Sequence, residues 1–169
     1  MRRNYHIENI LVDINRLEML EKQATFDFKN LVSKFGNDFV LGFSGGKDSV
    51  VVSHFASQFG INKGSCEYSF CFPKDKTEMK LIAKQMGLEI EFMDSLSDEW
   101  LLDNKKYIFP KGKDSSVFYL KRQQKSIKNF AKGHTGLITG RRHEENQIKD
   151  MLYKTVDGMY HFHPLANWN

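Results

Sequence analysis

The sequence predicts an α/β fold with three layers, in which a mainly parallel sheet lies between two layers of helices. Two observations lead to this prediction. Short apolar runs of strand length alternate along the chain with longer segments of helical spacing, and several of these segments end at a glycine. Strands that alternate with helices form right-handed crossover units, which build a parallel sheet covered on both faces. Strands are expected at 39–43, 65–72, 88–92, 137–139 and 160–162.

The N-terminal part predicts a long helix. Apolar residues from Ile7 to Phe35 recur at intervals of three and four residues, and Gly36-Asn37-Asp38 follows as a stop signal. We expect 1–36 to be a helical extension of a single domain spanning 1–169. Its apolar face would pack on that domain or form a homodimer interface. Further helices are expected at 49–59, 77–86 and 118–131, and residues 93–115 are expected to be mostly loop.

Composition limits the class of protein. A chain of 169 residues with 40% hydrophobic residues has enough material for one cored domain and is not typical of disorder. No apolar run reaches the roughly 18–20 residues of a membrane helix, and no apolar signal region follows the basic start Met1–His6. We therefore expect a cytoplasmic protein with no membrane partner. Cys66 and Cys71 are too few for a disulfide framework.

The charge is uneven along the chain. Residues 1–100 contain 12 Lys and Arg against 15 Asp and Glu, whereas residues 101–169 contain 13 against 6. A basic half indicates an anionic partner, either nucleotide phosphate or nucleic acid. The expected helix 118–131 has basic residues at helical spacing, which fits a nucleic-acid stripe, but a solvated face beside a nucleotide pocket is the simpler interpretation. These residues are Lys121, Arg122, Lys125, Lys128 and Lys132.

The stretch after the first expected strand, Ser44-Gly45-Gly46-Lys47-Asp48-Ser49, predicts a phosphate-binding loop. Glycines allow close approach of an anion to backbone N–H groups, and the start of the next helix adds positive potential. Lys47 adds charge, the two serines add hydroxyls, and Asp48 is a candidate Mg²⁺ ligand. The spacing fits neither a Walker A loop nor a dinucleotide fingerprint. A tight turn with an incidental lysine is the alternative.

A second basic motif, Gly140-Arg141-Arg142, follows the fourth expected strand. Ligands of parallel sheets bind at the carboxyl ends of the strands, so both motifs are expected at one edge, together with the Cys71–Lys76 loop that follows the second expected strand. The forked donors of arginine suit phosphate or sulfate oxygens. The alternative is that both arginines pair with Glu144 and Glu145 on the surface.

The loop Phe43–Ser49 resembles the PP-loop of the adenine nucleotide alpha-hydrolase-like superfamily. Two later segments, Thr139–Asn146 and His163–Trp168, resemble the G-[IVTR]-R-x-x-E-S and H-P-[LI]-x-x-W segments of its phosphoadenosine phosphosulfate (PAPS) reductase-like branch. The resemblance covers the chain from about Phe39 onward. It departs from the branch at Cys71–Thr77, where an Asp-Thr-Gly-like turn is often found, so nucleoside contacts are not carried over to that stretch.

The resemblance implies an adenine nucleotide ligand, either ATP or a sulfonucleotide (PAPS or adenosine phosphosulfate, APS), with Mg²⁺. With ATP, cleavage between the α- and β-phosphates would adenylylate an unknown acceptor. Catalytic roles fall to Lys47, Asp48 and Arg141. Phosphate binding falls to Ser44, Gly45, Gly46, Lys47, Asp48, Ser49, Gly140, Arg141 and Arg142.

Two other functions stay open. Reductases of this branch use a cysteine beyond the tryptophan segment, and no cysteine follows Trp168 here, so reduction would need Cys71 or a partner's thiol. The other is a non-catalytic nucleotide-binding subunit or sensor, with a partner chain that completes the site. No zinc or iron–sulfur cluster is expected, because the cysteines are not in C-x-x-C spacing and His161 and His163, which share a strand face, lack an evident third ligand.

Overall fold

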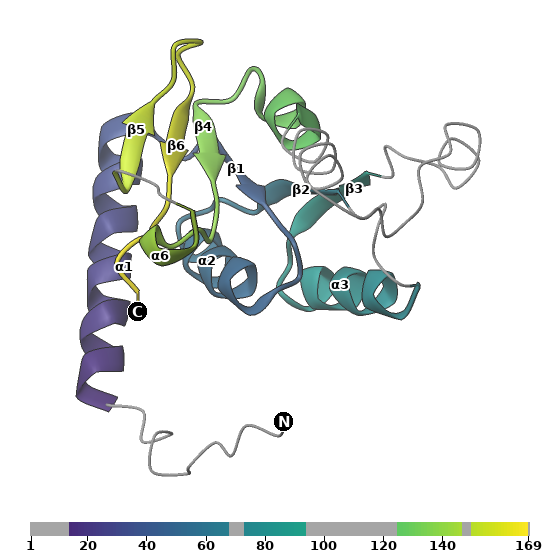
Figure 1. Cartoon of the computed structure of the whole chain (residues 1–169), viewed down its shortest axis with the longest axis horizontal. Coiled ribbons are helices and arrows are strands. Elements are labelled where there is room, and N and C mark those ends of the chain that lie inside the picture. The colour runs from purple at the N-terminus through teal and green to yellow at the C-terminus, as the bar shows by residue number, and fades with distance from the viewer. Residues whose placement is uncertain (1–13, 68–72, 94–124, 147–149, 169) are drawn as a thin grey trace.

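The computed structural model describes residues 14–67, 73–93, 125–146 and 150–168. Its six-stranded sheet has the order β3-β2-β1-β4-β6-β5. All neighbouring strands are parallel except β5 and β6, which are antiparallel. The predicted α/β class is therefore confirmed (Figure 1). The labelled elements are α1 (Ile14–Phe35), β1 (Phe39–Gly42), α2 (Lys47–Gln58), β2 (Lys63–Glu67), α3 (Pro73–Gln85), β3 (Glu89–Met93), β4 (Gly136–Ile138), α6 (His143–Asn146), β5 (Leu152–Lys154) and β6 (Tyr160–Phe162).

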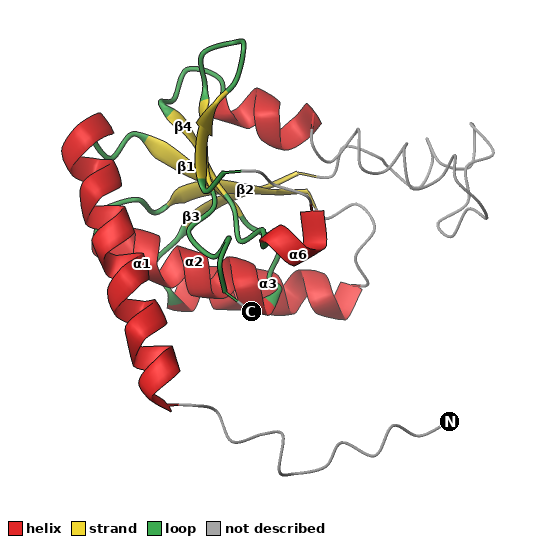
Figure 2. Ribbon diagram, turned by 60° about the vertical axis from the view of Figure 1, so that its left-hand side comes forward, coloured by secondary structure: helices red, strands yellow, loops and turns green. Residues whose placement is uncertain are grey.

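The two faces of the sheet are covered by different helices. Side chains of successive strand residues point to opposite faces. On β1, Phe39 and Leu41 accordingly join the main core beneath α1 and α2, whereas Val40 packs with Ala131 of the helical segment 125–131. Figure 2 shows α1, α2 and α3 on one side of the sheet and the segment 125–131 on the other. The three predicted layers follow from this alternation.

Helix α1 is anchored by an aromatic cluster around Phe28. Its fully buried ring stacks on Phe59 at 5.8 Å between centroids and meets Phe162 edge-on at 5.3 Å. Burying an aromatic side chain of this size is a large favourable contribution to folding. One face of the predicted N-terminal helix therefore packs on its own domain, and the homodimer interface stays a prediction. The expected turns before Ile14 lie outside the described residues.

Several element boundaries differ from the predictions. Helix α2 begins at Lys47, two residues earlier than expected, so the basic end of the loop belongs to its first turn. Helix α3 begins at Pro73 rather than at 77, because proline is well suited to a first helical position. Strand β2 spans only Lys63–Glu67 among described residues. The rest of that prediction (68–72), almost all of the 93–115 loop and positions 118–124 lie outside the described residues.

Strand β5 was missed from the sequence. It forms a hairpin with β6 in which Tyr153 pairs with His161. The turn contains Asp157-Gly158, with Gly158 at φ 87°, and the Thr155 amide donates to the Met159 carbonyl at 2.9 Å. An Asp-Gly pair between apolar runs is a strong hairpin signal, and it was available in the sequence. Among the helices that the structure describes, none has the length and apolar character needed to cross a membrane.

Candidate functional site

The two predicted motifs meet at the switch point of the sheet, where the order in which strands are added reverses. Strand β1 lies between β2 and β4, and the chain runs from β1 through α2 to β2 on one side before it returns to β4 on the other. In such sheets the crevice beyond the carboxyl ends of the two central strands is the usual ligand position. The Ser44–Ser49 loop follows β1, and Thr139–Arg142 follows β4. Their predicted convergence at one edge is confirmed.

Ser49 holds the loop in shape. Its Oγ accepts hydrogen bonds from the Ser44 amide at 3.2 Å and the Ser44 hydroxyl at 3.1 Å, and it donates to the Gly46 carbonyl at 2.8 Å. The Ser49 side chain is buried within this ring of bonds. The predicted phosphate-binding hydroxyl therefore also closes the loop, a role the sequence pattern did not reveal.

Glycine is required at the tip of the loop. Gly45 has φ 70°, a conformation that side chains with a Cβ rarely adopt, and a Cβ there would lie 2.2 Å from Met79 Cγ of α3. Gly46 is the N-cap of α2, which begins at Lys47. The first-turn amides of a helix have no partner within the helix, and the helix dipole is positive at this end. The loop and the helix start together form an anion-binding geometry.

The segment after β4 packs directly against this helix start. A Cβ on Gly140 would lie 2.7 Å from the backbone carbonyl carbon and oxygen of Asp48 and 3.0 Å from the Ser49 amide nitrogen. Arg142 Nε lies 3.5 Å from Asp48 Oδ2, and both side chains are partly buried. Arg142 is thus placed beside the loop, paired with Asp48.

Arg141 faces a different place from its neighbour. It lines a cavity of about 110 Å³ between the β4-β6-β5 side of the sheet and the helical segment 125–131. His161 and His163 line the same cavity with ring centroids 6.3 Å apart, so their predicted shared face is confirmed. Burial, and then the positive charges of Arg141 and His161, lower the pKa of His163 to about 4. Within the described residues, no three His, Cys, Asp or Glu side chains form a metal-binding group.

The segment His163–Trp168 has a packing role in the structure. Leu165 and Ala166 are buried, and the Ala166 carbonyl accepts the His143 amide at 3.0 Å. The Trp168 ring meets Phe55 of α2 edge-on at 6.1 Å. This segment ties the end of the chain to α2 and α6, next to the site.

Two other predicted groups lie away from the loop or outside the description. Cys66 is buried, as predicted for a structural cysteine, with its Sγ 3.9 Å from Met79 Sδ, whereas Cys71 lies outside the described residues. Exposed Lys125, Lys128 and Lys132 border a hollow of about 530 Å³ beside the residues that precede β4 and β6. That edge is opposite the loop, so these lysines do not extend the Ser44–Ser49 loop. Lys121 and Arg122 are not described.

Comparison with known proteins supports the fold. The sequence matches no protein-family model and no curated protein. The structure is similar to the NH3-dependent NAD synthetase from Campylobacter jejuni (TM-score 0.61, 16% identity, 90% of this chain and 68% of that one). It is also similar to the U34-tRNA thiolase NcsA from Methanococcus maripaludis, solved with its [4Fe-4S] cluster (TM-score 0.53, 15% identity). That match covers 88% of this chain and 60% of the thiolase.

At 15–16% identity the likeness shows the fold alone, and this chain has the α/β fold of these two structures. The resemblance of Phe43–Ser49 to the PP-loop stays a prediction from the sequence. The narrower resemblance to the PAPS reductase-like branch stays a prediction that rests on the Thr139–Asn146 and His163–Trp168 segments.

Proposed function

We propose that this chain binds an adenine nucleotide at Ser44–Ser49 and cleaves ATP between the α- and β-phosphates. The observation that supports this most directly is the loop itself. It is closed by Ser49, has Gly45 at positive φ, and opens on the start of the 12-residue helix α2 at the switch point of the sheet. An acceptor oxygen would attack the α-phosphorus, the bond to the bridging oxygen would break, and pyrophosphate would leave with the electron pair.

Residues of the loop and of the segment after β4 would each stabilise part of the negative charge on the nucleotide. Backbone amides of Gly45, Gly46 and the first turn of α2 would hold the leaving phosphates, and Lys47 would neutralise charge that develops on them. Gly140 allows the β4 segment to approach the loop, which brings Arg142 beside Asp48. Arg141, one residue earlier, would add positive potential from the cavity side.

A Mg²⁺ ion fits this arrangement through Asp48. The distance of 3.5 Å from Asp48 Oδ2 to Arg142 Nε is longer than an ordinary hydrogen bond, so the carboxylate keeps oxygen lone pairs for a cation. Mg²⁺ in nucleotide sites is commonly held by one or two carboxylates together with substrate phosphates. When bound, it would supply Lewis-acid charge at the phosphates.

The test is a screen of ATP, PAPS and APS that measures both binding and pyrophosphate release. With Lys47→Ala, we expect the affinity for ATP to fall by about tenfold or more, because a charge-assisted hydrogen bond contributes roughly 1.5–3 kcal/mol. Lys84→Ala, which removes another exposed lysine at the last turn of α3, is the matched control and should change nothing. Absence of binding by all three nucleotides, with Lys47→Ala indistinguishable from the unchanged protein, would refute the proposal.

The same screen separates the other functions. ATP binding without pyrophosphate release would indicate a nucleotide-binding subunit or sensor, and a partner chain would then be sought. Release of sulfite from PAPS or APS in the presence of thioredoxin or glutathione would indicate sulfonucleotide reduction. The burial of Cys66 argues against that residue as the nucleophile, which leaves Cys71 or a partner's thiol for that reaction.

A further inference from the structure

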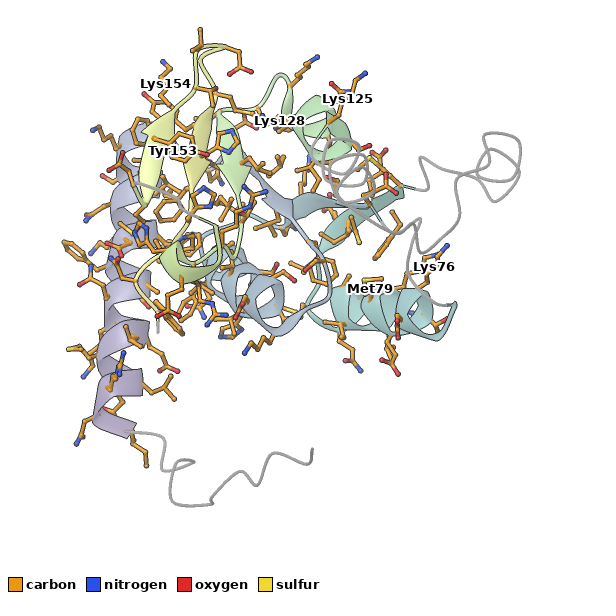
Figure 3. The ribbon with its side chains drawn as sticks, viewed as in Figure 1. Lys76, Met79, Lys125, Lys128, Tyr153 and Lys154 are labelled. Carbon is orange, nitrogen blue, oxygen red and sulfur yellow. The ribbon has the colours of Figure 1, made fainter. Side chains whose placement is uncertain are left out.

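The cavity beside Arg141 has features of a built site. It lies on the opposite face of the sheet from α1 and α2, and its polar lining comes from strands, the hairpin and the segment 125–131 (Figure 3 labels Tyr153 and Lys128). Strand β6 and the residue after it contribute two histidines. The polar lining residues are Lys128, Thr139, Arg141, Tyr153, Thr155, His161 and His163.

Each histidine has a contact on one side and, among the described residues, an Nε2 atom without a hydrogen-bond partner. His163 Nδ1 lies 2.8 Å from Thr139 Oγ1, and the His161 ring stacks on Tyr153 at 5.0 Å with an interplanar angle of 5°. The two side chains are 0% and 6% exposed, respectively. Within the described part of the chain, neither Nε2 atom has a hydrogen-bond partner. Buried polar nitrogens in native proteins are nearly always satisfied, so an unpartnered pair in one cavity calls for a partner there, either an ordered water or a bound ion.

The charge around these rings favours an anion. Burial lowers the pKa of His161, and the charges of Lys128 and Arg141 lower it further. The same Arg141 charge acts on His163, as does that of His143 more weakly. The carboxylate among the groups that act on His161 belongs to Asp157, which is exposed in the hairpin turn. The positive charges of Arg141 and Lys128 beside the cavity repel a metal ion and attract an anion.

We propose that this cavity is a binding site for a small tetrahedral oxyanion, sulfate or phosphate. Its ligands would be Arg141 and Lys128 as cations and the Nε2 atoms of His161 and His163 as hydrogen-bond partners. A volume of about 110 Å³ accommodates a group of a few heavy atoms and is well below the roughly 300–1,000 Å³ of pockets for drug-sized ligands. The site is thus too small for a nucleotide and is separate from the Ser44–Ser49 loop, so it does not depend on the proposed function.

The experiment titrates the nucleotide-free protein with sodium sulfate and with sodium phosphate, at constant ionic strength maintained by chloride. The imidazole NMR signals of His161 and His163 report on the cavity, and the signal of His54 serves as a reference outside it. We expect the signals of His161 and His163 to shift and saturate. The signal of His54, an exposed histidine on α2, should not move. Sodium acetate in a third titration shows whether a carboxylate uses the same site.

Two variants test the ligands. His161→Phe keeps an aromatic ring against Tyr153 but removes the nitrogen, and we expect sulfate to bind at least about tenfold more weakly. Lys128 is exposed, so Lys128→Ala should fold normally, and it should also weaken sulfate binding. Lys84→Ala is the matched lysine control and should bind sulfate as the unchanged protein does.

Several results would overturn the proposal. One is the absence of any saturable shift with sulfate and phosphate, which would leave water as the occupant. Another is loss of the histidine shifts in Lys47→Ala, which would assign the anion to the loop instead. A third is a response of the same signals to ZnCl2 but not to sulfate, which would make the pair a metal site. Failure of ATP to bind the protein would leave this proposal standing.

Discussion

His163 makes the stability of the fold depend on pH in a way that can be calculated from the structure. Its side chain is fully buried, and burial together with the charge of Arg141 lowers its pKa to about 4, compared with 6.5 for an ordinary histidine. Between these two values the unfolded chain binds a proton at this histidine and the folded chain does not. The contribution of neutral His163 to the free energy of unfolding is therefore fully present above about pH 6.5, and it is lost as the pH falls towards 4.

The magnitude follows from the two pKa values. On going from about pH 7.5 to about pH 5, the difference in protonation at this one residue amounts to about 2 kcal/mol in the free energy of unfolding. For a chain of this length that corresponds to a fall of about 4–8 °C in the melting temperature. Other groups titrate over the same range, so the comparison must be made against a variant that lacks only this proton site.

The assay is urea denaturation at both pH values for the unchanged protein and for His163→Gln. Glutamine does not titrate and can keep a polar contact with Thr139. We expect the unchanged protein to lose about 2 kcal/mol more than the variant on acidification. His54→Gln, at an exposed histidine, should lose as much as the unchanged protein. An identical loss of stability in His163→Gln and the unchanged protein would refute the reasoning.

Two further substitutions test the packing at the site and in the core. Gly140→Ala places a Cβ 2.7 Å from the Asp48 backbone, so we expect about 1–3 kcal/mol of destabilisation in urea denaturation, together with weaker ATP binding. Gly46→Ala is the control, because its Cβ meets only the Ser44 hydroxyl at 3.4 Å, and it should destabilise the protein less. Equal stability of these two variants would contradict the close approach. Phe28→Ala removes the ring that packs edge-on against Phe162, and urea denaturation should show that the free energy of unfolding falls by about 3–5 kcal/mol. A fall of less than about 1 kcal/mol would be incompatible with the burial of this ring.

The layers of the fold could be predicted because they depend on periodicity. The strand 160–162 and the alternation of strands with helices were visible as short apolar runs between helical segments. Helix starts were less well predicted, because Lys47 and Asp48 are polar and do not show in an apolar pattern although they form the first turn of α2. Strand β5 was missed because three residues give too little alternation to recognise without its turn.

The candidate site was predicted as a set of residues but not as an arrangement. The carboxyl-end rule for parallel sheets was enough to bring the Ser44–Ser49 loop and Gly140 together. The hydrogen bonds of the Ser49 hydroxyl within the loop depend on the exact path of the backbone, which the spacing of residues does not define. The cavity needs Lys128, Tyr153 and His163 from three separate segments, and no local pattern links such distant positions.

The Arg141-Arg142 doublet shows why a motif does not assign roles to its members. Arg142 lies beside Asp48 at the loop, and Arg141 lines the cavity with His163. Gly140, which precedes the doublet, lies against the start of α2, where a Cβ would be 2.7 Å from the Asp48 backbone. The doublet thus supplies one cation to each of two places, and the effect of replacing one arginine cannot be inferred from replacing the other.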